Sequence, residues 1–227
     1  MTFSPVVELR RYAMQPGRRD DLIDLFDREF LETQEGAGMT VIGQFRDLGD
    51  VDSFVWLRGF SDMAARRAAL TAFYGGPVWA RFRDQANATM ASSDNVFLLR
   101  PVRAGAGFAD DGRERPGPGA TGQPDGFVAA VTCHLAGPAD DRLIARFDAE
   151  AAPALAAAGM PVIATFVTEA AENTFPRLPV RAGENVLVFF CRMAAPDAAG
   201  LRAVIDRHLT GPVEVAVLQP TARSRLR

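Results

Sequence analysis

Three side chains able to do acid–base chemistry alternate along the segment VVELRRYAMQPG, residues 6–17: Glu8, Arg10 and Tyr12. Alternate residues of a β-strand project from the same face, so an acid, a base and a phenol would share one surface. We predict these three as catalytic residues. Glu8 would act as a general base or hold Arg10 in place, Arg10 would stabilise negative charge, and Tyr12 would donate a hydrogen bond or a proton.

Two further strand-like segments, residues 39–46 and 53–60, carry polar side chains on alternate positions. The ligand-binding residues predicted from them are Gln44, Arg46, Trp56 and Arg58. Three arginines against one glutamate leave an excess of positive charge, which favours a carboxylate, phenolate or enolate as the ligand. Two alternatives stay open at this point: a self-satisfied ion-pair network, or a strand register that turns these residues away from the predicted site.

The elements that carry these residues follow the order strand, helix, strand, strand, helix, strand, and this order occurs twice. The first set has strands at 5–13, 39–46, 53–60 and 95–100, a helix through Leu22 and Phe30, a helix at 62–73 and a helical stretch opened by Pro77. The second set has strands near 127–134, 161–168, 185–192 and 213–219, and helices near 139–157 and 196–209. This order is that of the ferredoxin-like βαββαβ unit.

An internal duplication underlies the repeated order. LIDLFDREFLETQEGAGMTVIGQF, residues 22–45, aligns without a gap to LIARFDAEAAPALAAAGMPVIATF, residues 143–166. The intervening stretch is rich in Gly, Pro and charge, which is typical of a linker or long surface loop. We therefore predict a first ferredoxin-like repeat at 1–100, a linker at 101–126 that crosses the outside as a poorly ordered loop, and a divergent second repeat at 127–227.

The predicted fold class is α+β, with two ferredoxin-like repeats forming a pseudo-dimeric α/β barrel. With Val7 and Leu9 turned toward the helices, Glu8 and its companions would line the inside of the barrel, which can hold one small ligand. The second repeat has Ala129, Val131 and Cys133 at the matching positions, so its wall would be apolar. Cys133 and Cys191 would face the same cavity, and we interpret them as buried, unreactive thiols.

VELRRYAMQPG, EGAGM, VIGQFRD, FVWLRGFSDMAAR and GPVWARF, in that order, resemble the NIPSNAP family over residues 6–100. The resemblance implies a dimeric α/β-barrel fold. The superfamily includes cofactor-free monooxygenases, small-ring isomerases and haem-binding enzymes, and the resemblance implies no settled reaction. The second repeat keeps the helix and AGMPVIATF but departs elsewhere.

Composition excludes several classes of function. A net charge of −3 gives no reason to expect binding to nucleic acid, which needs a basic face. No apolar run approaches the length of a membrane span. The chain has no lysine, which excludes lysine Schiff-base chemistry. No metal-ligand spacing is present, so we expect no metal and no cofactor. Two cysteines and the absence of a signal-peptide pattern favour the cytoplasm.

Two hypotheses from different classes remain. The first is a cofactor-independent monooxygenase or isomerase acting on a small anionic or aromatic molecule inside the barrel. The second is a non-catalytic binding or scaffold module, with homo-oligomerisation open in both cases. A cavity reached by Glu8, Arg10 and Tyr12 would favour the first hypothesis, and a barrel filled with side chains would favour the second.

Overall fold

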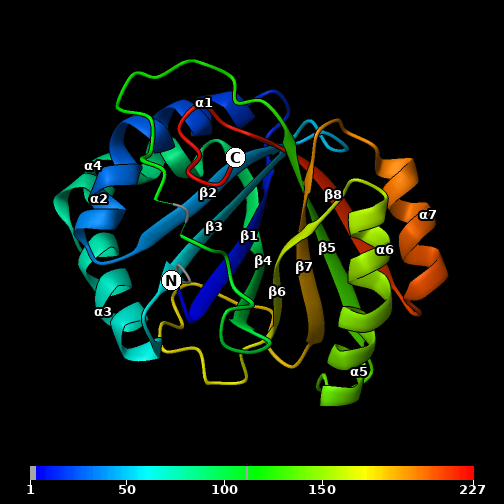
Figure 1. Cartoon of the computed structure of the whole chain (residues 1–227). Coiled ribbons are helices and arrows are strands. Elements are labelled where there is room, and N and C mark those ends of the chain that lie inside the picture. Colours follow the sequence, from blue (N-terminus) through cyan, green and yellow to red (C-terminus); the bar gives the residue numbers. More distant parts are fainter. Residues whose placement is uncertain (1–3, 111) are drawn as a thin grey trace.

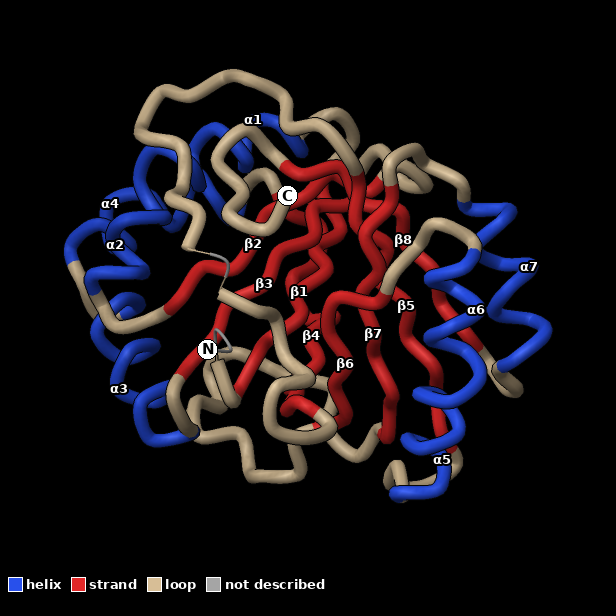
Figure 2. The backbone as a smooth tube through the Cα atoms, viewed as in Figure 1, coloured by secondary structure: helices blue, strands red, loops and turns tan. Residues whose placement is uncertain are grey.

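Eight strands close into a single barrel in the computed structural model, which describes residues 4–110 and 112–227 (Figures 1 and 2). The order around the barrel is β1-β3-β2-β8-β5-β7-β6-β4. The strands are β1 (Val6–Met14), β2 (Thr40–Asp47), β3 (Ser53–Phe60), β4 (Met90–Pro101), β5 (Phe127–Leu135), β6 (Val162–Thr168), β7 (Asn185–Met193) and β8 (Val213–Pro220). All the strand pairs are antiparallel.

The helices lie outside the barrel, on two opposite sides (Figure 2). Those of the N-terminal half are α1 (Arg19–Leu25), α2 (Leu31–Gly36), α3 (Met63–Tyr74) and α4 (Pro77–Asn87), with a π-helical turn, η1 (Phe26–Phe30), joining α1 to α2. Those of the C-terminal half are α5 (Asp141–Arg146), α6 (Ala152–Ala157) and α7 (Ala198–His208), with the matching turn η2 (Phe147–Ala151). The π-helical turn thus recurs at the aligned position of both repeats.

Two short seams join the half-barrels within one chain. At the first seam Phe45 pairs with Pro220 where β2 meets β8. At the second, Leu99 pairs with Thr168 where β4 meets β6. Because both edges of each four-stranded sheet are paired by the other half, the barrel leaves no free sheet edge among the described residues. The predicted fold class, two ferredoxin-like units in a pseudo-dimeric barrel, is confirmed.

The inside of the barrel is packed with apolar side chains from all eight strands. They include Val7, Leu9, Val55, Leu57, Phe97, Val128, Phe166, Val188, Phe190 and Leu218. The prediction that the barrel encloses a ligand is therefore wrong, because large aliphatic and aromatic side chains from both halves fill the interior. Two separate apolar layers lie outside it, each between one half-sheet and its own helices.

The linker expected at 101–126 is anchored more firmly than its composition predicted. Phe108 is only 2% exposed and packs into the barrel interior against Phe166 and Phe190. Arg115 donates hydrogen bonds to Glu35 and to the main-chain oxygen of Arg223. A few specific side chains thus tie down a segment that its glycine and proline content marked as loose. The domain boundaries within it stay predictions.

Candidate active site between the N-terminal sheet and its helices

The predicted catalytic side chains face the helices and not the inside of the barrel. Tyr12 and Trp56 belong to the apolar layer between the first half-sheet and α1–α4, whereas Val7 and Leu9 belong to the barrel interior. Alternation placed Glu8, Arg10, Tyr12, Trp56 and Arg58 correctly on one shared face. The side to which that face turns was predicted wrongly, because Val7 and Leu9 complete the interior core shared by the two halves.

Glu8 is the centre of a buried ionic cluster. Its Oε2 accepts hydrogen bonds from Arg10 Nη1 and Arg58 Nε, each at 2.7 Å, and its Oε1 accepts one from Arg66 Nε at 2.7 Å. All four side chains have 0% exposure. Charge-assisted hydrogen bonds of this length are about twice as strong as neutral ones, so the carboxylate fixes three guanidinium groups around itself.

The cluster carries more positive charge than Glu8 can neutralise. Three guanidinium ions surround one carboxylate, which leaves two net positive charges away from water. Within the described part of the chain, the Nη2 atoms of Arg10, Arg58 and Arg66 are buried without a hydrogen-bond partner. Buried donors and charges are costly unless they are paired. The donor set therefore suits an anion.

Burial and ion pairing act in opposite directions on the pKa of Glu8. Burial raises it, but the guanidinium groups of Arg58, Arg10 and Arg66 outweigh burial and hold the pKa well below its usual range. Glu8 is thus a permanent carboxylate and a weak base. Tyr12 behaves differently: burial raises its pKa, so the phenol stays protonated near neutral pH. Its Oη accepts from Arg10 Nε at 2.9 Å, which leaves the phenolic proton to be donated.

A small aromatic cavity lies against this cluster. It has a volume of about 30 Å³, enough for one or two water molecules. Its lining comes from β1, β3, β4 and all the helical segments of this half: Tyr12, Leu22, Phe26, Phe30, Gln34, Trp56, Phe73, Tyr74, Trp79, Ala86 and Met90. Four of these residues contact the arginines: Tyr12, Gln34, Trp56 and Tyr74.

Trp56 occupies the position between cluster and cavity. The guanidinium carbons of Arg10 and Arg58 lie 5.5 Å and 5.1 Å from its ring centroid, within the range of cation–π contacts. Its Nε1 is a buried donor without a partner in the described structure. Arg58 Nη1 also donates hydrogen bonds to Gln34 Oε1 at 3.2 Å and to Tyr74 Oη at 3.4 Å. The positive charges are thus held directly behind the cavity wall.

Gln44 and Arg46 lie apart from the Glu8 cluster. Gln44 donates to Asp27 Oδ1 at 3.2 Å, and Arg46 pairs with Asp20 near the surface. A β-bulge between Val41 and Gly43 shifts the alternation of β2, so both residues turn toward the helices while Phe45 enters the barrel. Their predicted position inside the barrel was wrong for this reason, and their role as ligand-binding residues stays a prediction.

Sequence reasoning missed two members of the cluster. Arg66 belongs to α3, where it stands in the buried stripe formed with Ala69, Leu70 and Phe73. A charged residue in an apolar helical stripe is the signal that could have identified it, since such a charge needs a buried partner. Gln34 is 1% exposed, and no feature of the sequence distinguished it from a surface residue.

The C-terminal half has no ionic cluster at the matching place. Ala129, Val131 and Cys133 pack there against apolar helical side chains. Cys133 and Cys191 are free and face this sheet–helix layer. Burial raises the pKa of each thiol to about 12, which makes them unreactive near neutral pH. The charged cluster thus lies in the N-terminal half, and apolar side chains occupy the matching place in the C-terminal half.

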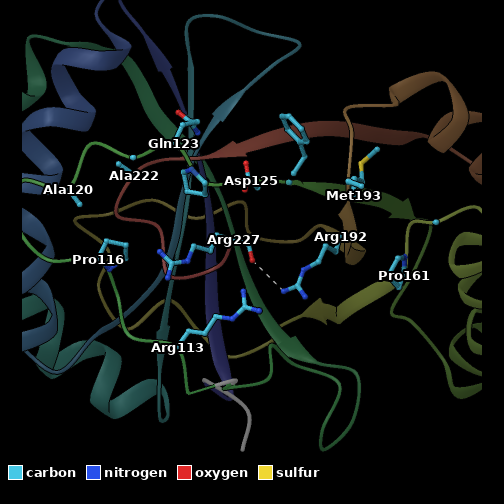
Figure 3. Close-up of a pocket in the computed structure, with 16 residues that line it drawn as sticks. Arg113, Pro116, Ala120, Gln123, Asp125, Pro161, Arg192, Met193, Ala222 and Arg227 are labelled. Atoms are coloured by element: carbon cyan, nitrogen blue, oxygen red, sulfur yellow. Dashed lines mark hydrogen bonds between the residues drawn. The ribbon is translucent and has the colours of Figure 1, made fainter.

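A wider groove of about 870 Å³ opens on the surface under the linker (Figure 3). Arg113, Arg192 and Arg227 point into it, beside the exposed Asp125. Arg192 donates to the main-chain oxygen of Arg227 at 3.5 Å. Unlike the donors of the Glu8 cluster, these arginines lie at the surface, where solvent screens their charge. The buried cluster is therefore the stronger candidate site.

The described residues lack two other kinds of feature. They contain no grouping of three or more His, Cys, Asp or Glu side chains that could hold a metal ion. None of their helices combines the length and apolar character that crossing a bilayer requires.

Residues 7–104 match the family model of NIPSNAP. The N-terminal half of the chain is therefore similar to NIPSNAP domains, and we call it the NIPSNAP half. The match covers the whole candidate site except the contacts from the C-terminal half. No curated protein matches the chain significantly.

Two solved structures share the fold of both halves of the barrel over nearly the whole chain. One is a proposed monooxygenase from Lactobacillus acidophilus NCFM, 13% identical, with a TM-score of 0.53 over 96% of this chain and 94% of that one. The other is a proposed monooxygenase from Fusobacterium nucleatum, 10% identical, with a TM-score of 0.57 over 97% and 94%. A NIPSNAP family protein from Agrobacterium tumefaciens is 21% identical over 44% of this chain and 94% of its own, with a TM-score of 0.41.

Proposed function

We propose that the NIPSNAP half binds a small aromatic anion, a carboxylate or phenolate, between its sheet and helices and stabilises the negative charge of that ligand. The observation that carries this proposal is the buried excess of two positive charges, with unpartnered guanidinium N–H groups, behind an aromatic cavity. Pairing an anion with these donors would satisfy them in a water-poor site, where the interaction is strong.

The roles of the predicted residues follow from their contacts. Glu8 is a positioning residue, because a carboxylate with so low a pKa holds the arginines and does not accept a proton from substrate. Arg10 and Arg58 supply charge to the ligand, and Tyr12 supplies a neutral O–H donor. Such a site favours the phenolate or enolate form of a bound molecule. That is the form in which cofactor-independent oxygenation or isomerisation begins, and the monooxygenase assignment of the two full-length neighbours supports this chemistry.

A ligand with a ring needs more room than the cavity offers. We infer that α4 moves to admit it, because α4 has Ala86 as its one fully buried residue. Trp79 and Phe82 of α4 are half-buried and pack over the cavity layer. The helix begins directly after Gly75 and Gly76, so a short glycine pair precedes the segment that would move.

Intrinsic fluorescence and calorimetry test the proposal together. Trp56 and Trp79 are the two tryptophans of the chain, and both line the cavity, so their emission reports a ligand there directly. We expect benzoate or salicylate to change the emission and to bind by calorimetry. Arg10→Ala should weaken binding roughly 10- to 100-fold, the equivalent of one charged hydrogen bond.

A pair of neighbouring arginines provides the control for this measurement. Arg66→Gln removes a buried member of the cluster, whereas Arg67→Gln changes an exposed side chain on the same helix. Only the first should weaken anion binding. Failure of the wild-type protein to bind any aromatic carboxylate or phenolate in the panel would refute the proposed function.

The second hypothesis, a non-catalytic module, is favoured by one observation, the filled barrel. In that case the Glu8 cluster would be an ion network that attaches α3 to β1 and β3. Arg10→Ala would then lower the free energy of unfolding while no aromatic anion bound to either protein.

A further inference from the structure

The loop between β6 and β7, residues 169–184, belongs to the C-terminal half but packs on the candidate site of the N-terminal half. Its counterpart in the first repeat, residues 48–52 between β2 and β3, is much shorter. Phe175 of the long loop is buried in the apolar layer that surrounds the cavity, and Leu178 packs against the same layer. The long loop therefore contributes side chains to the apolar layer around the candidate site.

Asn173 connects this loop to the ionic cluster. Its Oδ1 accepts from Arg66 Nη1 at 2.9 Å, while its Nδ2 donates to the main-chain oxygen of Leu178 at 2.9 Å. Thr174 Oγ1 accepts a second bond from Arg66 Nη1 at 3.3 Å and donates to the main-chain oxygen of Met63 at 3.2 Å. These bonds hold the Arg66 guanidinium at Nη1, while Glu8 holds it at Nε.

The chemistry of Asn173 is informative because the residue is neutral. A carboxylate at this place would pair with Arg66 and cancel half of the excess positive charge. An amide oxygen orients the guanidinium and leaves its charge intact. The choice of an amide therefore preserves the attraction for an anion while satisfying one buried donor.

Phe175 acts on the cavity wall. Its ring stacks on Tyr74 with centroids 5.9 Å apart and an interplanar angle of 29°. Tyr74 lines the cavity, and its hydroxyl accepts from Arg58. Phe175 thus supports from behind a residue that touches both the cavity and the cluster.

We propose that the β6–β7 loop of the C-terminal half determines the specificity of the anion site in the NIPSNAP half. Asn173 is a positioning residue that keeps Arg66 oriented without adding a counter-charge, and Phe175 limits the size of ligand by holding Tyr74 in place. The preferred ligand is a one-ring aromatic anion, and two-ring anions are disfavoured. This inference rests on the proposed function and assigns the second repeat a role in the site of the first.

Calorimetric titration of the full chain with benzoate and 1-naphthoate tests the loop. Asn173→Asp should lower the affinity for benzoate at least tenfold with no loss of thermal stability, because the new carboxylate pairs with Arg66. Phe175→Ala should shift the ratio of the two affinities at least fivefold toward 1-naphthoate. Glu172→Gln, an exposed neighbour in the same loop, should change neither value more than twofold.

The possible outcomes distinguish failure of the proposed role of the loop from failure of the proposed anion site. If Arg10→Ala abolishes binding but Asn173→Asp and Phe175→Ala bind both anions as the wild-type protein does, the loop is a structural cover and this inference is overturned, while the proposed function stands. If the wild-type protein binds neither anion, nor any other of the aromatic panel, the proposed function fails and the inference fails with it. A purely structural loop would also make Asn173→Asp indistinguishable from wild type in anion affinity.

Discussion

Substitution of Glu8 by glutamine removes the single negative charge at the centre of three buried guanidinium groups. Glutamine has nearly the same volume, so the change leaves no cavity; it removes the charge and replaces one accepting oxygen by an N–H donor. Breaking a buried ion pair by removal of one partner costs about 3–5 kcal/mol, because the remaining charge stays desolvated. Here three partners lose their counter-ion at once, so we expect a loss at the upper end of that range. A domain with about 5–15 kcal/mol of stability would be strongly affected.

Urea unfolding followed by circular dichroism measures this loss, and its pH dependence adds an independent check. Because the pKa of Glu8 is lower in the folded than in the unfolded protein, Glu8 stabilises the fold above its unfolded pKa, about 4.3. That stabilisation decreases as the pH falls below this value. The difference between wild type and Glu8→Gln should therefore shrink in acid. A loss below about 1 kcal/mol at pH 7, or a difference that does not depend on pH, would refute the description of Glu8 as a buried counter-ion.

Three other predictions concern the surroundings of the site. Burial raises the pKa of Asp27 to about 6, so the contribution of Asp27 to wild-type stability should fall as the pH rises from about 4 to 6. The variant Asp27→Asn should lack this trend. At pH 8 it should be more stable than wild type by on the order of 1–3 kcal/mol, as measured by urea unfolding. Gly43→Ala would place a Cβ 2.6 Å from the Phe45 ring at the β2 bulge, so it should lower stability by about 1–3 kcal/mol in thermal unfolding, and an unchanged Tm would contradict the observed packing. Cys133, buried and with its pKa raised to about 12, should react with a thiol reagent at pH 8 only after unfolding, and rapid labelling of the native protein would show that the layer around it is open.

The sequence by itself determined the order of the elements, and its ungapped internal alignment predicted a duplication. It also determined which side chains share a face. Glu8, Arg10 and Tyr12 lie together because a strand has a period of two, whatever surrounds it. The charge imbalance between one acid and several arginines was visible for the same reason, since Arg10 and Arg58 had to join Glu8 on neighbouring strands. The apolar residues at the matching positions of the second repeat, such as Val131, indicated that the two halves differ.

Only the tertiary structure decided which way that shared face turns. Both faces of each half-sheet are buried, one by the other half of the barrel and one by helices, so the apolar side of the strand does not reveal which layer it enters. The bulge between Val41 and Gly43 then reversed the alternation of β2, and no feature of the sequence was strong enough to place it. Arg66 comes from helix α3, and Asn173 comes from the β6–β7 loop in the C-terminal half of the chain. Their contacts with the cluster arise from packing between segments far apart in sequence, which local periodicity does not encode.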